Sequence, residues 1–307
     1  MGRDGFRHEA LIYRDEDDFL AGTVPYLWDA LEAGEAVLVV VRREKAALLQ
    51  GELGAEADAI RFGDMRELGR NPARLIPLWR DFLDEHEDRV IRGIGEPLWP
   101  GRGAAEVDEC ERHESLVNTA FAGRRPALSL LCSYDSSAFR DEVLSAVSHS
   151  HTGVERDGEM APSGAFEPQR DCFAGDLPDR PGREQGFEFD RTGLFDVRQR
   201  VTWAAKSAGA SQQATTDLVV AASELAANSI VHGGGTGTLY VWREAGRLLV
   251  EVEDSGRIEE PLVGRVRPQP TQVGGRGLWL ANQFCDLVQI RSGVAGTAVR
   301  LHMDLAG

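Results

Sequence analysis

The chain contains a run of six consecutive apolar residues, AVLVVV at Ala36–Val41, and this run constrains its fold more than any other feature. The run is too short to span a bilayer, which takes about 20 apolar residues in a helix. It has the length of one β-strand, and a strand that is apolar throughout is buried on both of its faces. The sequence therefore predicts a sheet covered by helices on each side.

The first 140 residues repeat this pattern, because short apolar runs alternate with amphipathic stretches of helical length. The expected strands are Ala10–Tyr13, Ala36–Val41, Ala59–Phe62, Arg89–Ile94 and Ser129–Tyr134. The expected helices are Asp15–Leu31, whose opening acids suit a helix N-terminus, a short charged helix after Val41, Ala73–His86 and Glu109–Phe121. Strands separated by helices predict βαβ units and a mostly parallel sheet.

Residues 141–186 lose this periodicity and are rich in Gly, Pro, Ser, Asp and Glu. Such a composition predicts a flexible linker between two domains. The segment contains the sequence HSH, with histidines at His149 and His151. No acid or cysteine stands at ligand spacing from them, so we expect solvated linker histidines rather than a metal clip.

Periodicity returns after the linker and predicts a second domain over residues 187–307. The expected elements are a strand at Phe187–Asp190, helices at Leu194–Gly209 and Ser211–Gly233, a hairpin of Thr238–Glu244 and Arg247–Asp254, a short helix at Gly277–Asp286 and two closing strands. Helices plus an antiparallel sheet form an α/β sandwich. The chain is therefore predicted to be a two-domain α/β protein with a first domain over 1–140, a linker over 141–186 and a second domain over 187–307.

Charge is distributed unevenly between these parts. The formal net charge is −16, of which −15 falls on residues 1–186. An acidic surface repels phosphate backbones, so direct binding of nucleic acid is not expected. The N-terminal sequence MGRDGFRHEA has no apolar signal core, and we expect a cytoplasmic protein without membrane attachment. The four cysteines show no CxxC spacing, which favours free thiols over disulfides or a zinc site.

Polar residues of the second domain form a pattern that its fold does not require. Glu224, Asn228 and His232 are spaced four residues apart and therefore lie on one side of a helix. Asp254 ends a strand and Gly256 follows two residues later. The glycines of GGRGL (274–278) open a helix, and Thr297 begins the last strand.

Each of these features taken alone has an ordinary interpretation, as a solvated helix edge, a turn or a helix cap. Together, and in this order, they fit a bound nucleotide. The Asn228 amide offers a neutral oxygen to Mg²⁺, and Glu224 one turn earlier can orient or deprotonate an attacking hydroxyl. Asp254 can accept the adenine amine, and Gly256 leaves room for the base. Backbone N–H groups at a glycine-rich helix start can bind phosphate.

Residues 187–305 resemble the GHKL-type ATPase domain, in the branch of bacterial anti-sigma factor/serine-protein kinases. The motifs ELAANSIVHG, EDSG, GGRGL and GTAV carry the resemblance. It implies the GHKL (Bergerat) α/β sandwich, and it implies ATP and Mg²⁺ as cofactors. The implied site residues are Glu224 as catalytic acid/base, Asn228 as Mg²⁺ ligand, Asp254, Gly256 and Thr297 at adenine, and Gly275 and Gly277 at phosphate.

Two interpretations remain open for each of two further residues. His232 fits a helix-end cap or a phosphate contact, and Arg276 fits a γ-phosphate contact or an exposed lid arginine. The sequence departs from the family pattern at Arg257, where a second glycine is common, and in the short lid between Gly256 and Gly277.

The resemblance implies serine/threonine-protein kinase activity toward a separate anti-sigma antagonist, and it implies binding of a sigma factor. It leaves open whether the chain forms a homodimer. Two alternatives remain: an ATP-dependent regulator that binds partners without phosphoryl transfer, and an atypical sensor histidine kinase. The second is disfavoured because the sequences around His8 and His113 lack the proline expected five residues later, where Tyr13 and Asn118 stand.

Residues 6–140 resemble a MEDS-type sensory domain. FRHEALIYRDEDDFL, ECERHESLVNTAF and LLCSYD carry this resemblance. It implies a RecA-like α/β fold that senses a small organic ligand, although GxxxxGK[ST] is absent. His8, Tyr13, Cys132 and Tyr134 stand at the motif positions, where a ligand pocket and ordinary packing around strand ends are both open.

Overall fold

The structure is a computed structural model that describes residues 5–168, 171–182, 185–269 and 275–305. The chain forms two compact units, unit 1 over Met1–Arg170 and unit 2 over Asp171–Gly307. Among the described residues, every helix is too short or too polar to cross a membrane.

Unit 1 is built on a seven-stranded sheet in the order β3-β2-β4-β5-β1-β6-β7. All neighbouring strands are parallel except β7, which pairs antiparallel with β6. The strands are β1 Arg7–Tyr13, β2 Ala36–Val41, β3 Ile60–Asp64, β4 Ile91–Gly95, β5 Leu128–Asp135, β6 Gly153–Arg156 and β7 Glu159–Pro162. The helices are α1 Glu16–Glu32, α2 Arg43–Leu53, α3 Met65–Leu68, α4 Leu75–Glu85, α5 Ala104–Phe121 and α6 Asp141–Ser150, with 3₁₀ turns at Gly54–Ala59 and Pro72–Arg74.

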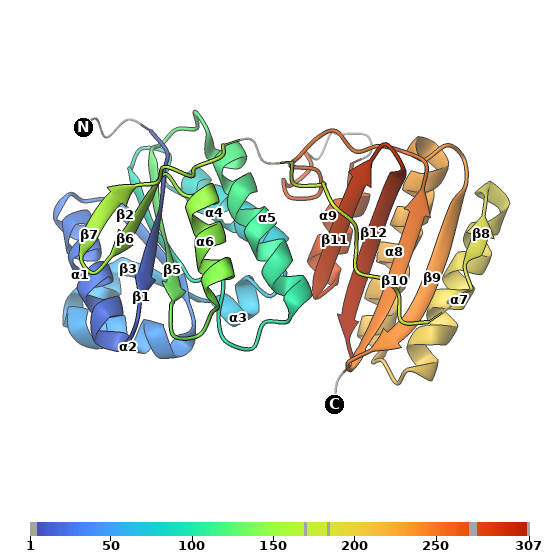
Figure 1. Ribbon diagram of the computed structural model, residues 1–307, viewed down its shortest axis with the longest axis horizontal. Helices are drawn as coiled ribbons and strands as arrows, with labels where there is room; N and C mark the ends of the chain where they lie inside the picture. The colour runs from blue at the N-terminus through green and yellow to red at the C-terminus, as the bar shows by residue number, and fades with distance from the viewer. Residues whose placement is uncertain (1–4, 169–170, 183–184, 270–274, 306–307) are drawn as a thin grey trace. The chain divides into compact units, whose positions relative to one another are not determined.

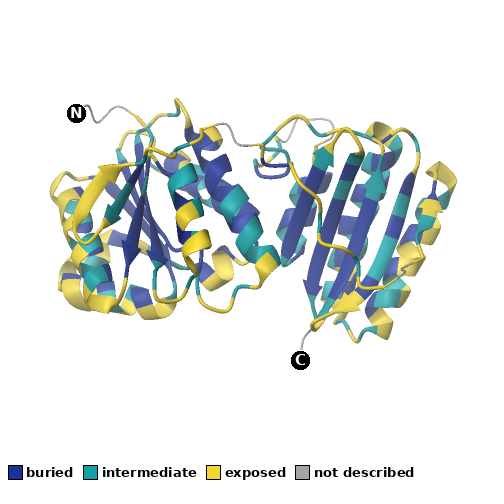
Figure 2. Ribbon diagram, viewed as in Figure 1, coloured by how far each residue is buried: buried dark blue, intermediate teal, exposed yellow. Residues whose placement is uncertain are grey.

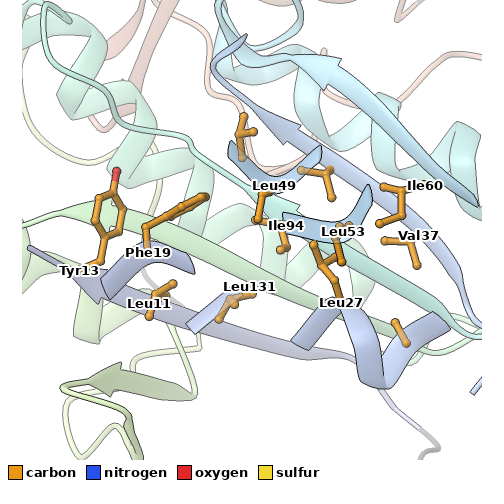
Figure 3. Packing of buried hydrophobic residues seen from close by; sticks show 13 residues of the cluster. Leu11, Tyr13, Phe19, Leu27, Val37, Leu49, Leu53, Ile60, Ile94 and Leu131 are labelled. Carbon is orange, nitrogen blue, oxygen red and sulfur yellow. The ribbon is translucent and has the colours of Figure 1, made fainter. Parts of the chain in front are cut away.

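The central strands β2, β4 and β5 are buried along almost their whole length, as the apolar runs predict (Figure 2). Alternate residues of a strand point to opposite faces of the sheet. On one face, Leu11 and Tyr13 of β1 pack with Phe19 of α1 and Leu49 of α2 (Figure 3). On the other face, α4 brings the Trp79 ring against β4. The prediction of a mostly parallel sheet with helices on both faces is confirmed.

The structure differs from the predicted linker in its first part, residues 141–162. These residues form α6 and the strand pair β6–β7, and β6 extends the sheet by pairing with β1. α6 buries Leu144 and Val147, but its remaining residues are mostly small or polar. Strands of four residues carry too short a pattern to be detected as alternation. The boundary between the units follows Arg170, later than the predicted end of the first domain.

Unit 2 contains a five-stranded antiparallel sheet in the order β11-β12-β10-β9-β8. The strands are β8 Phe187–Phe189, β9 Gly237–Glu244, β10 Arg247–Asp254, β11 Leu287–Gly293 and β12 Gly296–Asp304. The helices are α7 Leu194–Ser207, α8 Gln212–His232 and α9 Gly277–Phe284, with a 3₁₀ turn at Arg191–Gly193. All three helices cover the same face of the sheet (Figure 1). The predicted α/β sandwich is confirmed.

Helix α8 carries Glu224, Asn228 and His232 along one side, and these three residues are called the polar file below. The helix is positioned by its own ends and by its apolar side. Its N-cap residue Ser211 accepts a hydrogen bond from the Ala214 amide, as the sequence predicts for a serine cap. Leu218, Ala222 and Leu225 are buried. The file of Glu224, Asn228 and His232 occupies the less buried side of the same helix.

Candidate functional site

The polar file of α8 lies against the first residue of α9. Glu224 and Asn228 are half-buried, and His232 at the last turn is exposed. A Cβ atom on Gly277 would lie 2.9 Å from Asn228 Nδ2 and 3.1 Å from Glu224 Oε2. A larger residue at this position would displace the side chains of Asn228 and Glu224. The polar file and the glycine-rich motif, which are well separated in the sequence, meet in the fold.

The other residues of GGRGL stand beside this contact. Gly275 has a φ of +75°, a conformation that favours glycine, and Arg276 is the N-cap residue of α9. Both are exposed. The first glycine of the motif, Gly274, lies outside the described residues.

Asp254, at the end of β10, is connected to α8 by its carboxylate. Oδ2 accepts a hydrogen bond from the Ser229 hydroxyl at 2.7 Å, and Oδ1 accepts one from the Gly256 amide at 2.8 Å. The Ser255 hydroxyl donates to the Gly233 carbonyl at 2.9 Å. The end of β10 is thus held against the C-terminal end of α8, beside Asn228.

Gly256 and Thr297 lie beside Asp254 and form a corner of the sheet with it. A Cβ atom on Gly256 would lie 2.7 Å from the His232 carbonyl oxygen, so no larger residue fits without movement. Thr297 lies opposite Asp254 in the antiparallel register and is 8% exposed. Its hydroxyl donates to the Gly256 carbonyl at 2.8 Å. The predicted adenine-binding residues are therefore adjacent in the fold.

Two serines that the sequence interpretation does not include belong to the same corner. Ser229 donates to Asp254, and the Ser292 hydroxyl lies 2.7 Å from that of Thr297 and accepts from the Ile258 amide at 2.8 Å. Ser229 follows Asn228 directly, but a serine inside a helix carries no signal of its partner. Only the packing of α8 on β10 identifies it.

The arrangement can hold an anionic, magnesium-bound ligand beside a flat base. Asn228 supplies a neutral oxygen-bearing amide, and Glu224 supplies a carboxylate one helical turn away. The start of α9 presents backbone N–H groups, which favour phosphate. Each oxygen of Asp254 accepts one hydrogen bond and keeps a lone pair for a further donor.

A large cleft of unit 2, about 1450 Å³ in volume, follows the other face of the sheet. It is lined by Asp171, by residues 173–180 and by Glu251, Glu253 and Arg300 among others, and Asp254 and Thr297 also contribute to it. Glu224 and Asn228 do not line it. The Glu224 carboxylate, the Asn228 amide and the start of α9 converge on the α8 side instead.

In unit 1 the four residues predicted for a sensory pocket separate into two groups. His8, Cys132 and Tyr134 lie on the same face of neighbouring strands β1 and β5, and Cys132 Sγ lies 3.4 Å from His8 Nε2. Tyr13 points to the opposite face, where its ring packs on Phe19 with 5.2 Å between ring centroids. The odd spacing between His8 and Tyr13 on one strand is the physical reason.

Replacing Gly277 by Ala should lower the affinity for Mg–ATP by about tenfold, or about 1.4 kcal/mol. The added Cβ would displace the side chains of Asn228 and Glu224, while the backbone of α9 accepts alanine readily. Calorimetric titration of the purified chain with Mg–ATP measures this effect. Gly293→Ala is the matched control, because nothing lies within 4 Å of the position that its Cβ would take. Equal affinities for the two variants would contradict the prediction.

Comparison with known proteins assigns both units. Residues 187–303 match the family described as histidine kinase-like ATPase domain, and residues 7–152 match the family described as MEDS, the methanogen/methylotroph, DcmR sensory domain. No curated protein matches the chain.

Among solved structures, the chain is similar to the RsbU and RsbW domains of Rv1364c from Mycobacterium tuberculosis. The sequence identity is 21% and the TM-score is 0.30, and the match covers 39% of this chain and 32% of that chain. The chain spans about a third of that neighbour. From the two family matches, this protein consists of an N-terminal MEDS sensory domain followed by a C-terminal histidine kinase-like ATPase domain of the GHKL type.

Proposed function

We propose that the protein is a regulatory serine/threonine-protein kinase that transfers the γ-phosphate of ATP to an anti-sigma antagonist and binds a sigma factor. The MEDS domain would adjust this activity in response to a small organic signal. One observation carries the proposal: Glu224 and Asn228 meet the start of α9 at Gly277, next to the corner formed by Asp254, Gly256 and Thr297.

The residues fit Mg–ATP at its phosphate end. Asn228 would hold Mg²⁺ through its amide oxygen, and the ion would neutralise charge on the phosphates. The backbone at Gly275 and Gly277 would bind phosphate oxygens, with Arg276 beside them. Glu224 would accept the proton of the attacking serine or threonine hydroxyl.

The base would lie at the strand end. The Asp254 carboxylate is already fixed by Ser229 and Gly256, so the lone pair that each oxygen keeps is oriented without further ordering. It would accept the exocyclic amine of adenine. The Gly256 amide holds the Asp254 carboxylate, and Thr297 supports the Gly256 backbone through its hydroxyl.

The histidine kinase alternative is not supported by the packing of unit 1. A phosphoacceptor histidine must present its ring to a nucleotide, but His8 is 0% exposed and His113 is 1% exposed. Both rings are enclosed by the first domain. Phosphorylation at either position would require that domain to open.

The decisive experiment uses partners that co-purify with the protein from its native cell in the presence of ATP and Mg²⁺. With radiolabelled ATP, we expect Mg²⁺-dependent transfer of label to a serine or threonine of one partner. That label should survive acid, whereas phosphohistidine is lost in acid. ATP binding without any transfer would identify a partner-binding regulator, and acid-labile label would identify a histidine kinase.

A further inference from the structure

Unit 1 contains a buried cluster of four potential metal ligands that are far apart in the sequence. His8 comes from β1, Glu114 from α5 and Cys132 from β5, and His151 follows the end of α6. One ligand atom from each residue lies within 4.8 Å of all the others. His8 and His151 are 0% exposed, Cys132 is 2% exposed and Glu114 is 5% exposed.

The distances show that the ligand atoms face one another. Glu114 Oε2 lies 3.3 Å from His8 Nε2 and 3.1 Å from His151 Nε2. Cys132 Sγ lies 3.4 Å from His8 Nε2. The Tyr134 hydroxyl donates to Glu114 Oε2 at 2.9 Å. The centre of the cluster is therefore shared by two nitrogens, one carboxylate oxygen and one sulfur.

The outer hydrogen bonds fix how the two imidazoles are protonated. His151 Nδ1 lies 2.8 Å from the Val147 carbonyl oxygen, which can only accept. His8 Nδ1 lies 3.2 Å from Asn118 Oδ1, and Asn118 Nδ2 donates to the Ser150 carbonyl at 2.7 Å, which orients the amide. In the neutral imidazole each Nδ1 therefore carries the proton, and Nε2 is left with a lone pair that can bind a metal ion.

The cluster is consequently rich in acceptors. Two Nε2 lone pairs and the Glu114 carboxylate converge in a buried site, and the Tyr134 hydroxyl and the Cys132 thiol are the donors among these side chains. A buried carboxylate surrounded by acceptors is stabilised by a cation.

We propose that His8, Glu114, Cys132 and His151 form a binding site for a divalent transition-metal ion in the MEDS domain, and that Zn²⁺ is the ion it fits best. Two imidazoles, a carboxylate and a thiolate make four ligands of the types that Zn²⁺ takes in tetrahedral sites. Asn118 and Val147 accept hydrogen bonds from the two Nδ1 atoms, and outer partners of this kind orient metal-bound histidines.

The ion would have a structural role, because all four ligands come from the protein and are buried. It would connect β1, α5 and β5 to the residue that follows α6. On binding, the Cys132 thiol would release its proton to solvent and bind as the thiolate.

The structure corrects one sequence expectation here. His151 is enclosed in unit 1 and is not a solvated linker residue, whereas His149, two residues earlier, has a side chain that is 40% exposed. The absence of a CxxC spacing does not exclude a site for Zn²⁺, because its ligands are brought together by four separate parts of the fold.

The test uses the full chain, stripped of metal with a chelator and shown by circular dichroism to remain folded. We expect one equivalent of Zn²⁺ to bind in competition with a chromophoric chelator. Co²⁺ in its place should give a near-ultraviolet thiolate-to-metal charge-transfer band and the visible spectrum of a tetrahedral ion. A folded wild-type chain that binds no Zn²⁺, or a Co²⁺ complex without the thiolate band, would overturn the proposal without any variant.

Variants then identify the ligands. Cys132→Ser should abolish the thiolate band, and His151→Ala should weaken Zn²⁺ binding by more than about 100-fold. Asn118→Ala, which removes only an outer partner, should weaken it by about 10- to 100-fold. The matched controls are Cys110→Ser, another buried thiol of unit 1, and His149→Ala. Both should bind like wild type, and equal losses in controls and ligand variants would refute the assignment.

Discussion

Replacing Glu224 by Gln is expected to lower phosphoryl transfer to the antagonist by about 10²- to 10⁴-fold, the range that a general base contributes. The amide keeps the size of the carboxylate and its contact with Gly277, but it cannot accept the proton of the attacking hydroxyl. The affinity for Mg–ATP should change little, because Glu224 is proposed to act on the acceptor rather than on the nucleotide. Single-turnover transfer of radiolabel and calorimetric binding separate the two quantities.

Asp217→Asn is the control for this variant, because it makes the same change of charge on the same helix. Asp217 lies two turns before Glu224, about 10 Å along the axis of α8. The Asp217→Asn variant should transfer phosphate at the wild-type rate. If Glu224→Gln transfers phosphate at the wild-type rate, Glu224 is not the general base. That result would not contradict nucleotide binding by this domain.

Replacing Asp254 by Asn is expected to weaken ATP binding by about 10- to 150-fold, the value of a hydrogen bond to a charged group at about 1.5–3 kcal/mol. The carboxylate accepts from both Ser229 and Gly256, and asparagine has only one oxygen to offer. The Ser229 hydroxyl can turn its proton to the Leu225 carbonyl, 3.2 Å away, and accept from the new amide instead. The fold should therefore persist while the acceptor for adenine is weakened.

Comparison of ATP with GTP makes this second prediction specific. Adenine presents an amine where guanine presents an oxygen, so a carboxylate prefers adenine and an amide discriminates less. The preference of wild type for ATP should narrow in Asp254→Asn. Glu253→Gln is the control, because strand alternation turns Glu253 to the other face of the sheet, where Arg180 donates to it at 2.8 Å. If Asp254→Asn keeps the wild-type preference for ATP over GTP, Asp254 does not bind the base.

Most of unit 2 could be predicted from the sequence because its signals are local. The spacing of Glu224 and Asn228 places them on one side of α8 whatever the rest of the chain does. The contact of these residues with Gly277 and the hydrogen bond from Ser229 to Asp254 could not be predicted in this way. They depend on the packing of helices against a sheet, which residue spacing does not encode.

In unit 1, too, the features with a local sequence pattern could be predicted, and those that depend on long-range packing could not. Its apolar strands predict a parallel sheet, since strands buried on both faces are continuously apolar. The elements α6, β6 and β7 escape prediction because they are short, and the two strands are held in place by the pairing of β6 with β1. The burial of His151 escapes prediction for the same reason, since it follows from the position of α6 and not from the neighbours of His151 in the chain.

The sequence by itself determined the two architectures, the order of most of their elements and the polar file of α8, because periodicities of two and 3.6 residues act within a single strand or helix. Only the tertiary structure decided that His8, Glu114, Cys132 and His151 share one centre while Tyr13 faces away from it. The physical reason is that side chains from four parts of the fold converge only when the pairing register of β1 with β5, and the packing of α5 and α6 on them, are established together.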